Sequence, residues 1–149
     1  GPCRQVRDGN TIAMLQVAAN DLLTDLAEDP TFGGAWYEHA PCYRLVLAFT
    51  DVRDRTDLLD TVNPEVRPFI AFARSSYSNG ERDQARLAIG SALAAAAVQM
   101  TIFSVSVHPE QFTVGVATEA DAERARRLIP EPYRANTTVV VGNFEPTLE

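Results

Sequence analysis

The chain alternates between two hydrophobic periods, and the first of them is helical. Apolar residues of the opening segment recur at three- and four-residue intervals: Ile12, Leu15, Ala19, Leu22 and Leu26. This spacing places them on one face of an α-helix, so we expect a helix over residues 11–28. Asp8 or Asn10 can cap its start. Asp29-Pro30 should end it, because proline disfavours helical geometry in the preceding residue.

After this helix the period changes to two, which is typical of strands. A run around Ala35-Trp36-Tyr37 is followed by a Pro-containing turn and then by the run YRLVLAFT at residues 43–50. The second run is rich in β-branched, aromatic and aliphatic side chains, so it predicts a well-covered strand. Residues 54–61 should form a short helix, and residues 67–73 a third strand with Pro68 near its start.

A long alanine-rich helix is predicted over residues 81–100. Gly90 lies in its middle, where glycine is unfavourable relative to alanine by about 1 kcal/mol. We therefore expect another part of the chain to approach the helix backbone closely at this point.

The last third of the chain returns to strands. Residues 101–107 and 111–117 predict a hairpin around the turn His108-Pro109-Glu110. Thr118 can then cap a helix over residues 119–129. The run TTVVV at residues 137–141 predicts the final strand.

These elements predict an α+β fold with two ββαβ lobes, each a small, mostly antiparallel three-stranded sheet with a helix. The expected segments are an N-terminal helix (1–31), a first lobe (32–78), a linking helix (79–100), and a second lobe with the C-terminal tail (101–149). We expect them to form one compact unit, since a chain of 149 residues is long enough to bury a good core.

The two lobes can be aligned as an internal repeat. One offset of 68 residues pairs Pro41 with Pro109, Val46 with Val114, Thr50 with Thr118 and Pro64 with Pro132. The alternative is that the matches have no common origin, because any two ββαβ units share turn prolines and helix caps.

Charge and hydropathy exclude two classes of partner. The net charge is −7 and the pI is near 4.8, whereas nucleic-acid binding normally requires a basic patch. No apolar run approaches the roughly 18 residues that are needed to cross a bilayer. We therefore expect neither a nucleic-acid partner nor a membrane span.

The two cysteines, Cys3 and Cys42, leave three alternatives open. They can form a disulfide in an oxidising compartment or remain free thiols. Cys3 can also be the lipid-bearing first residue of a mature bacterial lipoprotein, and so a lipid anchor. The start, Gly1-Pro2, resembles the remnant left by a tag-removing protease, so we expect that a natural signal peptide has been removed.

Catalytic motifs are absent from the sequence. It contains no Gly-x-Ser-x-Gly elbow, no phosphate-binding glycine loop and no metal-binding histidine pair. His39 and His108 both fall at predicted turns, which favours a structural role. The spacing of Asp51, Asp54, Asp57 and Asp60 is typical of solvent-exposed cap residues. We expect no enzyme, cofactor or metal, and the alternative is a small hydrolase that uses His39 or His108.

Three segments together resemble a known family. They are DLLTDLAEDPTFGGAWYEHAPCYRLVLAFTD (21–51), VRPFIAFARSSYSNGERDQARLAIGSAL (66–93) and FSVSVHPEQFTVGVATEADAERARRLI (103–129). They are similar to the first lobe, the linker helix with its preceding strand, and the second hairpin with its helix in the pro-regions of α-lytic protease and streptogrisin-type secreted bacterial serine proteases. The resemblance spans residues 21–141.

The resemblance implies a non-catalytic binding module. Pro-regions of that family help their protease to fold and then inhibit it: the sheet of the second lobe pairs with a protease hairpin, and the C-terminal tail enters the active-site cleft. Carried onto this chain, the sheet edge would be Val139, Val140 and Val141, and the tail would be Phe144, Glu145, Pro146, Thr147 and Leu148.

The partner implied by this resemblance is an extracytoplasmic chymotrypsin-like serine protease, and the protein would be periplasmic or secreted. The alternative is a periplasmic or lipoprotein interaction module that keeps the fold and binds an unrelated protein.

Overall fold

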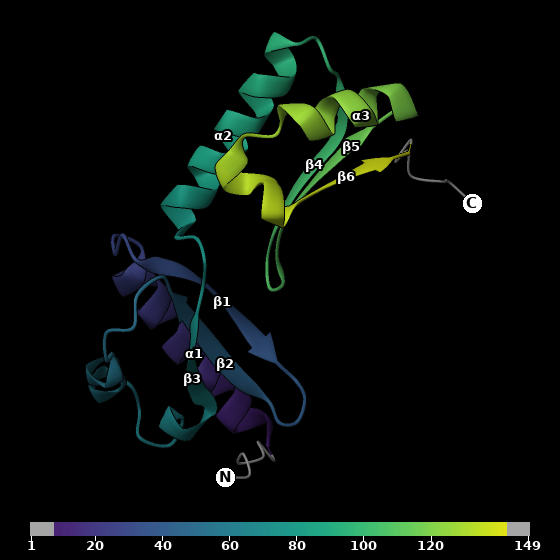
Figure 1. Ribbon diagram of the computed structural model, residues 1–149. Helices are drawn as coiled ribbons and strands as arrows, with labels where there is room; N and C mark the ends of the chain where they lie inside the picture. Colours follow the sequence, from purple (N-terminus) through teal and green to yellow (C-terminus); the bar gives the residue numbers. More distant parts are fainter. Residues whose placement is uncertain (1–7, 143–149) are drawn as a thin grey trace. The chain divides into compact units, whose positions relative to one another are not determined.

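Each half of the chain folds into a three-stranded sheet with helices against it (Figure 1). The computed structural model describes residues 8–142. The chain divides into two compact units, Gly1–Asn79 and Gly80–Glu149. The predicted α+β class with two ββαβ lobes is confirmed.

The first unit consists of a helix, a hairpin and a crossover to a third strand. Its elements are α1 (Gly9–Leu26), β1 (Phe32–Glu38), β2 (Arg44–Phe49), the 3-10 helices η1 (Thr56–Thr61) and η2 (Arg67–Phe69), and β3 (Ile70–Arg74). β2 lies between an antiparallel β1 and a parallel β3. Only one of the two pairings is therefore antiparallel, because the crossover returns the chain to the sheet in the direction of β2.

The core of the first unit lies between α1 and one face of its sheet. Leu15, Leu22 and Leu26 of α1 are buried in one apolar cluster with Leu45 and Leu47 of β2. Asp8 caps the helix, as one of the two predicted caps, by accepting a hydrogen bond from the backbone N–H of Thr11 at 2.7 Å. The helical period of the sequence thus identified the buried face correctly.

The second unit has the same order of elements. They are α2 (Asn79–Ala95), β4 (Met100–Val107), β5 (Glu110–Val116), α3 (Glu119–Leu128), the 3-10 helix η3 (Glu131–Asn136) and β6 (Thr137–Val141). β5 is again central, antiparallel to β4 and parallel to β6. Thr118 caps α3 as predicted, and Phe112, Val114 and Val116 of β5 are buried.

Equivalent hydrogen bonds recur in the two units at an offset of 67 residues. Arg67 and Arg134 each donate to the backbone carbonyls five and seven residues earlier in the chain. The parallel pairings are each extended by one bond, from Ser75 N to Phe49 O at 2.9 Å and from Gly142 N to Val116 O at 3.0 Å. Shared prolines and caps alone do not account for side-chain bonds of the same geometry, so the contacts favour a repeat.

The offset of 68 predicted from the sequence is correct for the first strand of each sheet and for the cis proline of the hairpin loop that follows, Pro41 or Pro109. Bulges lie between Phe32 and Gly34 and between Met100 and Ile102, at that offset. From β2 and β5 onward the offset is 67, because the second hairpin is one residue shorter. Val114 therefore corresponds to Leu47 and not to Val46.

The helix predicted as a linker belongs to the second unit and is equivalent to α1. Ile89 and Leu93 of α2 are fully buried, as are Leu22 and Leu26 at the offset of 67. Each repeat is therefore a helix followed by a ββαβ unit. The expected close approach at Gly90 is wrong: a Cβ atom added there would meet nothing within 4 Å among the described residues.

Helix α2 ends at Ala95, before the predicted end at Met100. Ala97 has a φ of 58°, and its N–H and that of Val98 bond back to Ala94 O at 3.0 Å and Leu93 O at 2.9 Å. This is a Schellman motif, which usually has glycine at the left-handed position. The alanine run carries no such signal, so the sequence did not reveal the end of the helix.

Replacing Ala97 by glycine is expected to stabilise the second unit by about 1 kcal/mol, because alanine is strained in the left-handed region. Hydrogen exchange of β4 and β5 amides should slow by about fivefold for such a change. Ala94→Gly is the matched control: Ala94 lies inside α2, so glycine there should speed exchange. Faster exchange in Ala97→Gly would contradict the prediction.

Candidate functional site

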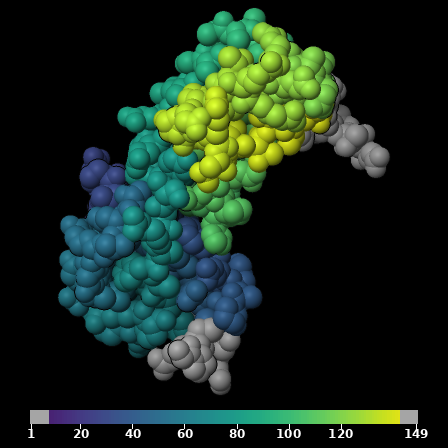
Figure 2. All heavy atoms as spheres, viewed as in Figure 1, coloured from purple at the N-terminus to yellow at the C-terminus, as the bar shows by residue number. Residues whose placement is uncertain are grey.

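The outer side of β6 is an unpaired sheet edge within residues 8–142. β6 is the last strand in the order β4-β5-β6. The side chain of Val141 is 44% exposed, and Val139 and Val140 are half-buried. In Figure 2 the yellow atoms of β6 are visible along one side of the second unit. The structure thus places all three predicted edge residues on an edge strand.

The register of β6 determines which backbone groups face outward. Gly142 donates its N–H inward to Val116 O, and Val141 is the residue paired with Val116. Backbone N–H groups alternate in direction along a strand. Those of Val139 and Val141 therefore point away from β5, while that of Val140 points toward it.

Residues Thr137–Val141 contain no charge, no proline and no glycine. Proteins usually protect an exposed edge with charged residues or proline, because the unpaired groups otherwise recruit another strand. The equivalent edge in the first unit, β3, ends in Arg74 and follows Pro68. β6 is thus less protected than β3 and better suited to strand addition.

The remaining predicted site residues are only partly covered by the structure. The predicted tail, Phe144, Glu145, Pro146, Thr147 and Leu148, lies outside the described residues. Cys42 is buried and disulfide-bonded. Cys3 also lies outside the described residues, so its pairing with Cys42 and the lipid alternative stay predictions.

His39 follows β1 and His108 lies between β4 and β5, both in the hairpin loops where the sequence predicted them.

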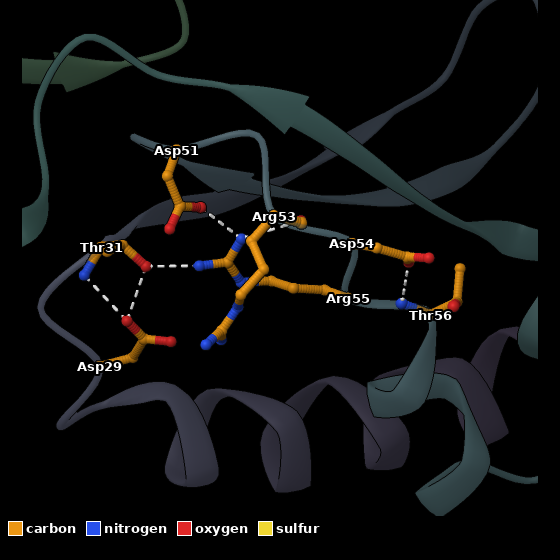
Figure 3. A network of polar contacts seen from close by, with 7 residues as sticks. All are labelled: Asp29, Thr31, Asp51, Arg53, Asp54, Arg55 and Thr56. Carbon is orange, nitrogen blue, oxygen red and sulfur yellow. Dashed lines mark hydrogen bonds and ion pairs between the residues drawn. The ribbon is translucent and has the colours of Figure 1, made fainter.

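A polar network in the first unit surrounds the buried Arg55, which is 4% exposed (Figure 3). Its Nη1 donates to Asp51 Oδ1 at 2.5 Å, and its Nη2 donates to Thr31 Oγ1 at 2.6 Å. Thr31 in turn donates its hydroxyl and its N–H to Asp29 Oδ1, at 2.7 and 2.8 Å. The guanidinium also lies 3.8 Å above the ring of Phe49. The guanidinium of Arg55 therefore covers the buried ring of Phe49 at the edge of the hydrophobic core.

The sequence did not indicate this network. Asp51 was expected to be a solvated cap residue, but it accepts the hydrogen bond of a buried arginine. At the offset of 67, Arg55 corresponds to Ala122, which is fully buried in α3. An alignment of the two repeats at the offset of 67 would have paired Arg55 with an alanine on the apolar face of a helix, and this pairing could have predicted that Arg55 is buried.

The network lowers the pKa of its carboxyl groups. The hydrogen bond from Arg55 is the main cause for Asp51, and the hydroxyl and N–H of Thr31 are the main causes for Asp29. A lowered pKa means that the folded state prefers the ionised carboxylate. These carboxylates therefore stabilise the fold above their ordinary pKa, and this stabilisation is lost as the pH falls through the lowered value.

Asp51→Asn is expected to lower the stability of the first unit at pH 7, with a difference from the original protein that narrows below about pH 4. Urea unfolding followed by the fluorescence of Trp36, the only tryptophan, measures this unit. Asp25→Asn is the control, because Asp25 is exposed on α1 and its side chain makes no hydrogen bond among the described residues. An Asp51→Asn difference that is constant down to pH 2 would contradict the role of the carboxylate.

Two further features bear on the chemistry of the chain. No helix within residues 8–142 is long and apolar enough to cross a membrane. The described part of the chain also holds no group of three or more histidine, cysteine or acidic side chains arranged to bind a metal.

Comparisons with known proteins do not assign the chain to a family. No protein-family model matches it, and no curated protein matches it significantly.

Proposed function

We propose that the protein is a non-catalytic binding module that adds an extended segment of its partner to the edge of β6. The observation that carries this proposal is the β6 edge itself, a β-branched strand with outward N–H groups and no protecting charge or proline. Strand addition derives its affinity from backbone hydrogen bonds, with few demands on side chains.

The proposed partner is an extracytoplasmic chymotrypsin-like serine protease, which the protein would inhibit or help to fold. The resemblance of residues 21–141 to the pro-regions of such proteases supports this choice. The disulfide at Cys42 supports an oxidising compartment, since disulfides persist mainly outside the cytosol. A periplasmic or secreted location follows from the proposal.

The test is inhibition of α-lytic protease by the purified protein. Residual peptidase activity should fall in a saturable way as the protein is added. Val139→Pro should raise the inhibition constant about tenfold or more, because proline removes one outward N–H and its ring obstructs the incoming strand. The first unit is unchanged in this variant, so its Trp36 fluorescence should be normal.

Two matched variants separate the edge from the fold. Val139→Thr keeps the N–H and the β-branched shape, so inhibition should persist. Val140→Pro removes an N–H that points toward β5, so it should destabilise the second unit by about 2 kcal/mol. Equal inhibition by Val139→Pro and Val139→Thr would refute strand addition at β6. No inhibition of α-lytic protease or of the secreted chymotrypsin-like proteases of the host would refute the protease partner and leave the alternative, an unrelated extracytoplasmic partner.

A further inference from the structure

The first unit contains a hollow of about 230 Å³ beside the Arg55 network. It lies at the carboxyl ends of β2 and β3, where the chain leaves the sheet. We call it the Arg55 hollow, and its chemistry is set by Phe49, Val52, Arg53, Arg55, Phe72 and Arg74. None of these residues belongs to the β6 edge, so the hollow is a separate feature.

The walls of the Arg55 hollow are cationic. Asp51 is the only acidic residue among its lining residues, and its carboxylate already accepts from Arg55. The side chains of Arg53 and Arg74 make no hydrogen bond or ion pair with any described residue, and both are exposed. Three guanidinium groups lie near two carboxylates, Asp51 in the lining and Asp29, which Arg53 and Arg55 also attract, so a local positive charge remains on a chain whose net charge is −7.

Arg55 contributes a buried positive charge to the wall of the hollow. Its Nε is buried and has no hydrogen-bond acceptor in the described part of the chain. A buried cation with an unpartnered donor favours negative charge nearby, because the folded protein compensates its field only in part. Asp51 compensates one end of the guanidinium and remains 41% exposed itself.

The floor of the Arg55 hollow is apolar. The ring of Phe72 lies 6.3 Å from that of Phe49, between centroids, and is 38% exposed. Val52, on the loop after β2, is 84% exposed. Exposed apolar side chains beside unpaired arginines match a ligand that is apolar at one end and anionic at the other.

We propose that the Arg55 hollow binds a carboxylate carried on a single aromatic or branched apolar group. The volume selects this class, because a cavity of about 150 Å³ holds one benzene ring and drug-sized ligands need about 300 Å³ or more. The carboxylate pairs with Arg53 and Arg74, and the apolar group lies against the exposed side chains of Phe72 and Val52. Such a carboxylate can belong to a small acid or to the terminal residue of a peptide.

The experiment is an amide NMR titration with three probes: N-acetyl-L-phenylalanine, its neutral C-terminal amide, and the peptide Ala-Ala-Ala-Phe with a free carboxylate. We expect the acid to shift the amides of residues 51–55 and 72–74, and the neutral amide to bind about tenfold more weakly. Tighter binding of the peptide than of N-acetyl-L-phenylalanine identifies a peptide terminus as the source. Equal or weaker binding of the peptide identifies a small acid.

Variants that remove a positive charge test whether N-acetyl-L-phenylalanine binds in the Arg55 hollow. Arg53→Met and Arg74→Met should each weaken binding of N-acetyl-L-phenylalanine about tenfold. Arg86→Met is the matched control, because Arg86 is exposed on α2 and the substitution changes the net charge equally. The proposal is overturned if the three variants bind alike, if the neutral amide binds as tightly as the acid, or if shifts occur elsewhere only.

Discussion

Gly33→Ala is expected to destabilise the first unit by about 3 kcal/mol or more, which is the upper part of the range for overpacking a core. A Cβ atom on residue 33 would lie 1.9 Å from Ser75 Oγ and 2.8 Å from both Ser75 Cβ and Tyr77 O. Ser75 is 5% exposed and donates to Tyr77 O at 2.9 Å, so it cannot move aside without losing that bond. The backbone oxygen cannot rotate away at all.

Urea unfolding followed by Trp36 fluorescence measures this loss, since Trp36 lies in β1 together with Gly33. Gly90→Ala is the control, because a Cβ atom at Gly90 meets nothing and alanine favours the interior of α2. That variant should leave the fluorescence transition unchanged and stabilise the second unit by about 1 kcal/mol. A loss below about 1 kcal/mol in Gly33→Ala would mean that β1 and the segment after β3 separate easily.

The local period of the sequence was sufficient for most elements. β6 spans Thr137–Val141 as predicted, because a run of β-branched residues favours an extended strand. α3 begins after Thr118 because a hydroxyl cap satisfies a free backbone N–H. In both cases the residues that define the element are neighbours in the sequence, so no tertiary contact was needed.

Features that depend on distant contacts were not predictable in this way. The pairing of β2 with β3 is parallel because of the crossover between them, and no local pattern gives its direction. The offset of 67 differs from the predicted 68 by one residue in a hairpin loop. A shift of one residue exchanges the two faces of a strand. The corrected offset therefore pairs Val114 with Leu47, which belongs to the core cluster with α1, and not with Val46 on the opposite face of β2.

The two candidate sites also depended on contacts between residues that are distant in the sequence. The β6 edge was predicted from a resemblance, and a strand sequence alone cannot say whether its partner is on one side or both. Which N–H groups point outward became known only from the register of Val141 with Val116. The Arg55 hollow was missed because arginine is rarely buried, and sequence patterns place it on the surface.

A comparison of the two units explains why Arg55 is buried. In the second unit, helix α3 places Ala122 in the core position that follows the central strand. In the first unit the same region, residues 51–55, is not helical, and the next turn, η1, is a 3-10 helix that begins at Thr56. A long side chain is therefore required to cover Phe49 from the loop.

Arg55→Ala is accordingly expected to destabilise the first unit by about 2–3 kcal/mol, although alanine occupies the equivalent position in the second unit. The variant loses the cation–π contact with Phe49, worth about 1–2 kcal/mol when it is shielded from water. It also loses the charge-assisted bond to Thr31 and leaves a cavity over Phe49. The variant also loses the stabilisation that Arg55 gives to the ionised Asp51, which is modest because the Asp51 side chain is 41% exposed and is hydrated once it is released.

Arg53→Ala is the matched control for this prediction, because Arg53 lies in the same loop but is exposed and unpaired among the described residues. Its effect on stability should stay within about 0.5 kcal/mol. Arg55→Met should fall between the two, since methionine keeps an apolar cover over Phe49 and loses only the charge. Urea unfolding at pH 7, followed by Trp36 fluorescence, should therefore rank the variants as Arg53→Ala, Arg55→Met and Arg55→Ala in order of increasing loss. If Arg55→Ala were as stable as Arg53→Ala, the loop would cover Phe49 without the guanidinium, and the network would have no structural role.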